Sequence, residues 1–294
     1  MSKVLIVGGS GFVGRAIQKY VLTEGIADDY VFSFNSHSRN VDNRLSKVQL
    51  NLSLRETVDY KVSLYHRAIY LVGGNRRYSD EQNVEIDILA FLNFMKYYRG
   101  SLVLLSSQAV YDDLDGKVSE NVDHVVTHPR AITKQALESF AKHFAKVGWL
   151  TKLCILRSKY IFGEGEENSR LIPQLARKKK TKITDGGKAV LSLLPVGFVA
   201  RILVKTEKEV SKIDTVETIM NMNYPSKITV KDVLDFLLTV DHSLDFEITD
   251  EPEVFPVRYY GDTSKLRIWM ERWDERFPNI WEEVRRYYFL LREG

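Results

Sequence analysis

The sequence is poor in cysteine, in long apolar runs and in net charge, and each shortage excludes a class of protein or site. The single cysteine, Cys154, cannot form a disulfide within the chain, and its position in the apolar run LTKLCILR predicts a buried, inert thiol. No run of about 18 apolar residues occurs, so we expect no membrane span. The formal net charge of +3 is too small to indicate a nucleic-acid partner.

Metal-ligand patterns and targeting segments are also missing. The six histidines are scattered, and no cluster of cysteine and histidine has the spacing of a metal site, so we expect no metal centre. The N-terminus, MSKVLIVGGSGFVG, passes directly into a strand pattern without the charged, apolar and small-residue zones of a signal peptide. We therefore expect an intracellular, cytoplasmic protein. The 294 residues, 44% of them hydrophobic, are enough for one large domain or two smaller ones.

Short apolar runs alternate with longer helical patterns through the first two thirds of the chain. The expected strands are residues 3–7, 30–34, 47–51, 67–72, 101–107 and 152–158. The expected helices between them are residues 11–25, 83–100 and 129–148. Near-continuous apolar strands that are separated by helices predict a parallel sheet with helices on both faces. The fold class is therefore α/β, with a doubly wound parallel sheet of the Rossmann type.

The rhythm of the sequence changes after about residue 160. Residues 169–179 have a helical pattern, TDGGK at 184–188 predicts a turn, and residues 228–240 begin with a Thr/Asp helix-start signal. Aromatic residues spaced three and four apart in residues 268–291 predict one further helix that packs on the rest of the protein.

This change in rhythm gives the expected domain boundary. We expect residues 1–160 to form the Rossmann domain, and residues 161–294 to complete the sheet and to form a smaller substrate lobe. The lobe should lie over the carboxyl ends of the strands, because doubly wound sheets bind their ligands there.

A glycine pattern follows the first expected strand. Gly8, Gly11 and Gly14 are spaced three apart, directly after the apolar run KVLIV and at the start of a helical pattern. Glycine is needed there because the backbone turns tightly, approaches a diphosphate without a Cβ and packs the helix closely on the strand. This is the context that a dinucleotide site requires; the alternative is a glycine-rich turn with no ligand. The expected cofactor contacts of this turn are Gly8, Ser10, Gly11, Phe12, Val13 and Gly14.

The end of the second strand favours one nicotinamide cofactor over the other. A carboxylate there would accept hydrogen bonds from a ribose 2′-hydroxyl, but the sequence offers Asn35, Ser36, His37, Ser38 and Arg39 instead. Hydrogen-bond donors and a guanidinium suit a 2′-phosphate. We therefore favour NADP over NAD, with Ser36 and Arg39 as contacts, although Arg39 is also explained as an ordinary loop arginine.

Several motifs together resemble the extended short-chain dehydrogenase/reductase family, which includes nucleotide-sugar epimerases, dehydratases and reductases. The motifs, in order, are GGSGFVG, AIYLVGG (68–74), Asn83 at a helix start, LLSSQAVYD (104–112), PRAITKQALE (129–138), LRSKYIFGEGEENSRLIPQLA (156–176), TDGGK and DTSKL (262–266). The resemblance covers nearly the whole chain. It implies an NAD(P) cofactor, a nucleotide-linked sugar as substrate, and cofactor contacts from Leu71, Val72 and Gly73.

The resemblance also implies a catalytic set, and this chain matches only part of it. In such enzymes a serine, here Ser107, orients the reacting oxygen, and a tyrosine four residues before a lysine supplies the proton. The lysine binds the nicotinamide ribose of the cofactor and lowers the tyrosine's pKa. Residues four apart share a helix face. Lys134 matches the lysine, but Arg130 occupies the tyrosine position. Arginine does not exchange protons at neutral pH, so we expect Arg130 to contact the substrate or to lie on the surface of an inactive site.

Three other residues are candidates for the missing proton donor, and each has a structural alternative. Tyr160, which stands where the family has an asparagine, either faces the nicotinamide or serves packing. His128 either titrates near the site or lies solvated in a loop. Tyr111 either donates a proton or packs.

Leu191 and Phe198 replace an expected arginine and acidic residues, which puts the usual nucleotide-sugar substrate in doubt.

These observations leave different functions open. One is an NAD(P)-dependent reductase or epimerase that transfers a hydride on a nucleotide-linked or similar sugar, with Ser107, Lys134 and Tyr160 as catalytic residues; base rates for the fold favour it. Another is an inactive cofactor-binding protein that serves as a structural, sensor or assembly subunit. A fold that no longer binds the cofactor is the third. The helices at 83–100 and 129–148 correspond to a pair that forms four-helix dimers in similar proteins, which allows a homodimer.

Overall fold

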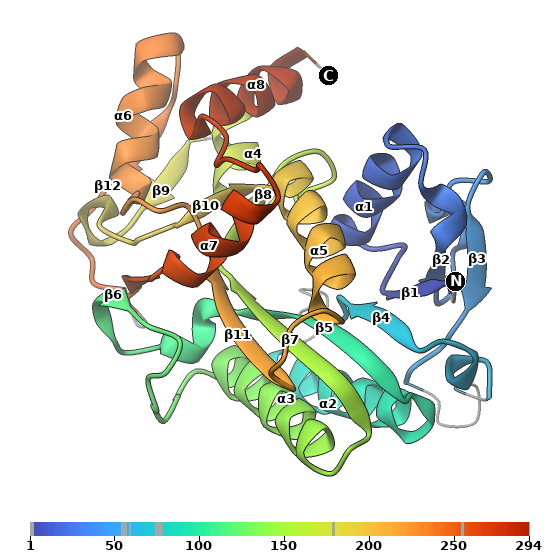
Figure 1. Cartoon of the computed structure of the whole chain (residues 1–294). Helices are drawn as coiled ribbons and strands as arrows, with labels where there is room; N and C mark the ends of the chain where they lie inside the picture. Colours follow the sequence, from blue (N-terminus) through green and yellow to red (C-terminus); the bar gives the residue numbers. More distant parts are fainter. Residues whose placement is uncertain are drawn as a thin grey trace. The chain divides into compact units, whose positions relative to one another are not determined.

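The computed structural model describes residues 3–53, 58, 60–73, 79–177, 180–253 and 256–293, with only the backbone at residue 80. Gly74 and residues 178–179, which belong to predicted segments, lie outside the described residues. The chain forms two compact units (Figure 1). The first unit takes its residues from 1–110, 126–157 and 199–220, and the second takes its residues from 111–125, 158–198 and 221–294. The expected domain boundary at residue 160 stays a prediction.

A seven-stranded sheet forms the centre of the fold, in the order β11-β7-β5-β4-β1-β2-β3. Its strands are β1 (Val4–Val7), β2 (Tyr30–Phe34), β3 (Ser46–Gln49), β4 (Arg67–Tyr70), β5 (Gly100–Ser107), β7 (Leu150–Ser158) and β11 (Glu217–Met222). β1 pairs in parallel with β2 and β4, and the pairs β2–β3 and β4–β5 are also parallel. This arrangement confirms the predicted α/β fold with a doubly wound parallel sheet.

The apolar runs explain the strand positions. All four residues of β1 are buried, because both faces of the central strand are covered. Leu5 pairs with Val31 on one side and with Ala68 on the other. All three residues belong to the hydrophobic core of the first unit. Cys154 on β7 is fully buried, and burial raises the pKa of its thiol, which confirms the predicted buried cysteine.

Three helices of the first unit match the predicted helical segments. They are α1 (Phe12–Thr23), α2 (Asp80–Tyr97) and α3 (Pro129–Lys146), and α2 and α3 lie side by side (Figure 1). α2 begins three residues earlier than predicted, because Ser79 and Gln82 form a capping box: Gln82 N donates to Ser79 Oγ at 3.2 Å, and Ser79 N donates to Gln82 Oε1 at 3.0 Å. A fourth helix, α5 (Val196–Val210), follows the short strand β10 (Leu193–Pro195).

The second unit combines small sheets with helices around a core of its own. Its two-stranded sheets pair β8 (Tyr160–Phe162) with β10, β9 (Thr181–Ile183) with β12 (Phe246–Ile248), and β6 (Asp115–Val118) with β13 (Arg258–Gly261). Its helices include α4 (Leu171–Ala176) and α6 (Val230–Val240). A capping box between Thr229 and Asp232 starts α6, which confirms the predicted Thr/Asp helix-start signal.

The predicted single helix at residues 268–291 is wrong. The structure has two helices there, α7 (Ser264–Arg272) and α8 (Ile280–Glu293). Asp274 adopts a positive φ of 51°, which ends the helical path, and Pro278 lacks the N–H that a continuous helix would need. The aromatic spacing persists across this break because α7 and α8 each bury an apolar face.

A buried lysine in the second unit makes stability depend on pH. Lys159 Nζ donates to the carbonyl oxygen of Tyr259 at 2.5 Å and lies 3.9 Å from the centroid of its ring. Burial lowers the pKa of Lys159 from 10.5 to about 7. Between these two values the unfolded chain binds a proton that the folded chain does not, so the contribution of Lys159 to the free energy of unfolding increases as the pH rises.

We expect Lys159→Met to remove this pH dependence. Guanidinium unfolding at pH 7, 8.5 and 10 should show that the wild-type protein gains stability relative to the variant, by at most roughly 1.4 kcal/mol for each pH unit. Lys227→Met, at an exposed lysine of the same unit, is the control and should follow the wild-type curve. If Lys159→Met and the wild type changed in parallel with pH, the buried lysine would not be the titrating group.

Candidate functional site

The predicted glycine turn joins β1 to α1, and its geometry requires glycine. Gly8 has a φ of +86°, a region that other residues rarely adopt. A Cβ on Gly9 would stand 2.8 Å from Phe32 Cβ, and a Cβ on Gly14 would stand 2.4 Å from the carbonyl oxygen of Gly9. These contacts are too short for any side chain, so the three positions let α1 start directly against the end of β1.

The N-terminus of α1 has the features of an anion site. Gly11 is the N-cap, and among the described residues no side chain makes a capping hydrogen bond there. The first turn has no acidic residue, Gly11 is exposed, and Ser10, Phe12 and Val13 are partly exposed. The first amides of a helix carry a partial positive charge and lack intrahelical partners. The turn therefore fits the diphosphate of a dinucleotide, as the glycine spacing predicts.

Gln18 connects this turn to the segment after β2, a role that sequence reasoning missed. The side chain is 5% exposed. Its Nε2 donates to the carbonyl oxygens of Gly9 at 2.8 Å and Asn40 at 3.0 Å, and its Oε1 accepts from Asp42 N at 2.9 Å. The available signal was a polar residue on the buried face of an amphipathic helix.

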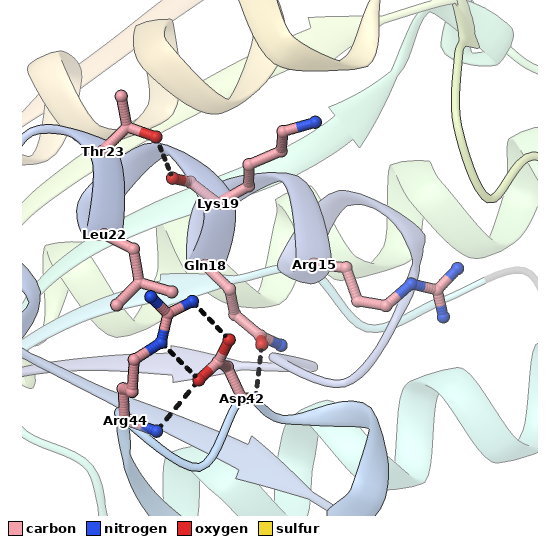
Figure 2. Close-up of a pocket in the computed structure, with 7 residues that line it drawn as sticks. All are labelled: Arg15, Gln18, Lys19, Leu22, Thr23, Asp42 and Arg44. Atoms are coloured by element: carbon pink, nitrogen blue, oxygen red, sulfur yellow. Dashed lines mark hydrogen bonds and ion pairs between the residues drawn. The ribbon is translucent and has the colours of Figure 1, made fainter.

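A pocket of about 430 Å³ opens beside Gln18 (Figure 2). Its lining comes from Arg15, Gln18, Lys19, Leu22, Thr23, Asp42 and Arg44. Arg44 is paired with Asp42, with Nη2 2.8 Å from Oδ2. Ser36 and Arg39, the predicted 2′-phosphate contacts, are exposed after β2. Arg39 directly precedes Asn40, whose carbonyl oxygen accepts a hydrogen bond from Gln18. The structure therefore adds further basic residues near the predicted selectivity segment.

Gly73 and Lys134 are brought together just after β4, the strand that pairs in parallel with β1. Leu71 N donates to the carbonyl oxygen of Val7 at 2.9 Å, so the residues after β4, including the partly exposed Val72, continue alongside β1. A Cβ on Gly73 would stand 2.5 Å from Lys134 Nζ. The ammonium of α3 thus reaches the backbone at the end of β4.

Ser107 is the last residue of β5, and the end of this strand is linked to α3, the helix that carries Lys134. Its Oγ accepts a hydrogen bond from Ala109 N at 3.1 Å, which leaves the hydroxyl hydrogen for another acceptor. The preceding residue, Ser106, donates to Glu138 Oε1 at 2.6 Å, and Glu138 lies one turn after Lys134. The end of β5 is therefore fixed to α3.

Charges around Lys134 act in opposite directions. Burial lowers the pKa of Lys134, whereas the carboxylates of Asp87 and Glu138 raise it. Asp87 Oδ2 lies 3.0 Å from the position that a Gly73 Cβ would take, close to the ammonium. Sequence reasoning missed Asp87; the available signal was its place one turn after Asn83 on α2.

Arg130 lies one turn before Lys134 and is exposed. Its backbone N donates to Nδ1 of His128, which is the N-cap of α3. This histidine has a local structural role that the two proposed alternatives, solvated residue or proton donor, did not include. This hydrogen bond caps the first turn of α3, so His128 stabilises the start of the helix that carries Arg130 and Lys134.

The two tyrosine candidates lie in the second unit. Tyr111 is 1% exposed and donates to Asn221 Oδ1 at 2.8 Å, which confirms its packing role. The ring of Tyr160 lies 3.9 Å from the guanidinium of Arg170, and burial raises the pKa of its phenol. The catalytic role of Tyr160 stays a prediction.

Leu191 and Phe198 take part in apolar packing of the second unit. Leu191 packs against the core of this unit, and its N donates to the carbonyl oxygen of Ile228 at 2.8 Å. Phe198 is 2% exposed, with its ring centroid 5.4 Å from that of Phe277. Within the described ranges, no group of three or more His, Cys, Asp or Glu residues is arranged to hold a metal, and no helix is long and apolar enough to cross a membrane.

Comparison with solved structures finds the same fold in proteins of low identity. MoeE5 in complex with UDP-glucose and NAD is 19% identical, with 99% of each chain covered and a TM-score of 0.81. UDP-glucose 4-epimerase from Thermotoga maritima is 16% identical, with 99% of each chain covered and a TM-score of 0.81. dTDP-glucose 4,6-dehydratase from Bacillus anthracis, in complex with NAD, is 16% identical. The alignment covers 100% of this chain and 97% of the dehydratase chain, with a TM-score of 0.81.

Sequence comparison gives the family. A search of curated proteins finds no match. The model of the NAD dependent epimerase/dehydratase family matches residues 4–219, which include the glycine turn, Ser107 and Lys134. This match spans well over half of the chain, and it agrees with the predicted resemblance to extended short-chain dehydrogenases/reductases. The chain belongs to the NAD dependent epimerase/dehydratase family.

Proposed function

We propose that the protein binds a nicotinamide dinucleotide in its first unit and acts on a nucleotide-linked or similar sugar as an epimerase or reductase. The observation that carries the proposal is the pair of cofactor features in one unit: an uncapped helix N-terminus at the glycine turn, and the Lys134 ammonium against Gly73. Family membership supports it, as do the bound NAD and UDP-glucose in MoeE5.

The residues of the first unit supply binding and orientation. The amides at the start of α1 and the backbone of Gly8 to Gly14 would hold the diphosphate, and Lys134 would hold the ribose next to the nicotinamide. A bound nicotinamide supplies hydride transfer. Ser107 can donate a hydrogen bond to a substrate oxygen, because its Oγ already accepts from Ala109 N. Arg130, exposed at the same helix, can bind a carboxylate or phosphate of the substrate.

The proposed cofactor preference is NADP. Ser36 and Arg39 offer a hydroxyl and a guanidinium after β2, and the pocket beside Gln18 adds Arg15 and Lys19. Three cations in this region favour a 2′-phosphate over a bare hydroxyl. NAD is the alternative, since the solved relatives named above that contain a dinucleotide contain NAD.

The second candidate function is binding of the cofactor without turnover, as a structural, sensor or assembly subunit. The observation that favours it is the poor acidity of the side chains at positions 130 and 160. A guanidinium, as at Arg130, does not release a proton at neutral pH, and burial raises the pKa of the Tyr160 phenol. A phenol with a raised pKa is a weaker acid than the family's tyrosine, whose lysine lowers its pKa.

We expect Gly11→Ala to weaken cofactor binding at least tenfold while the protein stays folded. A Cβ there would stand 3.2 Å from the carbonyl oxygen of Gly8, which is tolerable for the turn, but it would project where a diphosphate approaches the amides. Fluorescence titration with NADPH and NADH measures the effect, and thermal unfolding checks the fold. Gly197→Ala, at an exposed glycine with open space around it, is the control. Absence of binding of both coenzymes at millimolar concentration to the wild type would overturn the proposed function.

Turnover is tested at position 130. With NAD(P)H and a panel of nucleotide-linked keto-sugars, we expect Arg130→Gln to lower kcat/KM at least tenfold, about 1.4 kcal/mol, because the substrate loses a charged contact. Lys146→Gln removes an exposed charge at the other end of α3 and should have no effect. Arg130→Tyr should raise kcat, since it restores a phenol one turn before Lys134. Tight cofactor binding with no turnover in the wild type would instead favour the second candidate function.

A further inference from the structure

Two opposite charges share the space beside Gly73. Gly73 has a φ of +144°, and a Cβ built on it would stand 2.5 Å from Lys134 Nζ and 3.0 Å from Asp87 Oδ2. Asp87 comes from α2 and Lys134 from α3, and the aspartate is 5% exposed. The lysine and the aspartate therefore meet at a point that only a residue without a side chain leaves open.

Two other charged groups lie on α3 near Lys134, Glu138 and Arg130, and the surroundings of each reduce its effect on the ammonium. Glu138 lies one turn further along α3, but its carboxylate is paired with Arg157 at 2.6 Å and accepts from Ser106 at 2.6 Å. This pairing offsets much of its charge. Arg130 is exposed to water, which screens it. Complete burial, together with the nearby carboxylate of Asp87, raises the pKa of the Tyr70 phenol, so this tyrosine stays neutral.

Burial of an ammonium is unfavourable unless a negative charge lies close to it. Lys134 is partly buried: its helix packs beside α2, and its Nζ lies beside Gly73 just after β4. Asp87 is the carboxylate from a neighbouring element that reaches the same point. A neutral residue at position 87 would leave Glu138, which is itself paired with Arg157, as the carboxylate that opposes the effect of burial on the ammonium.

We propose that Asp87 is the positioning residue of Lys134: its carboxylate keeps the ammonium charged and fixed against Gly73 over the pH range in which the cofactor binds. The second half of this proposal rests on the proposed cofactor site. The first half concerns the protein alone, so the two are tested separately.

The first measurement uses the protein without cofactor. NMR titration of protein labelled with ¹³C-lysine, with the Lys134 signal assigned by its loss in Lys134→Arg, gives the pKa of Lys134 directly. We expect Asp87→Asn to lower this pKa by at least one unit, about 1.4 kcal/mol. Glu85→Gln removes an exposed carboxylate from the same helix and should leave it unchanged. An unchanged pKa of Lys134 in folded Asp87→Asn would overturn the proposal.

The second measurement follows NADPH and NADH affinity between pH 6 and pH 10. In Asp87→Asn the affinity should fall at lower pH than in the wild type, with at least a tenfold difference near pH 9, whereas Asp87→Glu should restore the wild-type profile by returning the charge. Equal profiles for Asp87→Asn and the wild type would overturn the role in cofactor binding. If Asp87→Asn did not fold, Asp87→Ser would provide the neutral variant. A shifted pKa of Lys134 without binding of either coenzyme to the wild type would remove the proposed function and leave the pairing of Asp87 with Lys134 supported.

Discussion

The first unit depends on how closely α1 approaches the end of β1. A Cβ at Gly14 would stand 2.4 Å from the carbonyl oxygen of Gly9 and 2.5 Å from that of Gly8, so only glycine allows this approach. The helix then begins at the turn itself, with its first amides exposed. One turn later Gln18 reaches back to Gly9 and across to Asn40. A single close approach therefore positions both the turn that is proposed to bind the diphosphate and the segment that is proposed to bind the ribose.

Glycine serves a different purpose at Gly73. The atoms nearest to the position of its missing Cβ belong to side chains, so the absence of a side chain leaves room for a lysine from α3 and an aspartate from α2. Both helices are held by strong N-terminal caps, Ser79 with Gln82 for α2 and His128 for α3. The geometry beside Gly73 is thus set by two helix starts and one residue without a side chain, which is a rigid arrangement for charged groups.

The sequence predicted the parts of the structure that rest on periodicity and on backbone constraint. Strand β2 was predicted at its exact bounds, and the glycine turn was placed correctly, because apolar runs and glycine spacing are local signals. Gln18 and Asp87 were missed because each is one polar residue in an amphipathic helix whose partners come from other elements; Asn40 is 22 residues from Gln18. The two C-terminal helices were predicted as one, because the apolar spacing continues across a break that the backbone makes at Asp274.

Arg130 and Lys134 carry like charges one turn apart, yet their environments separate them. Arg130 is exposed, so water reduces its repulsion of Lys134, whereas the lysine is partly buried and its charge is stabilised by Asp87. A tyrosine at position 130 would occupy the same exposed start of α3 and would not alter the contacts of Lys134 with Gly73. The exchange of a phenol for a guanidinium would therefore change proton transfer without disturbing the charge that is proposed to hold the cofactor. The proposed proton-transfer position and the proposed cofactor-binding lysine are therefore physically separable on this helix, because their side chains have different surroundings.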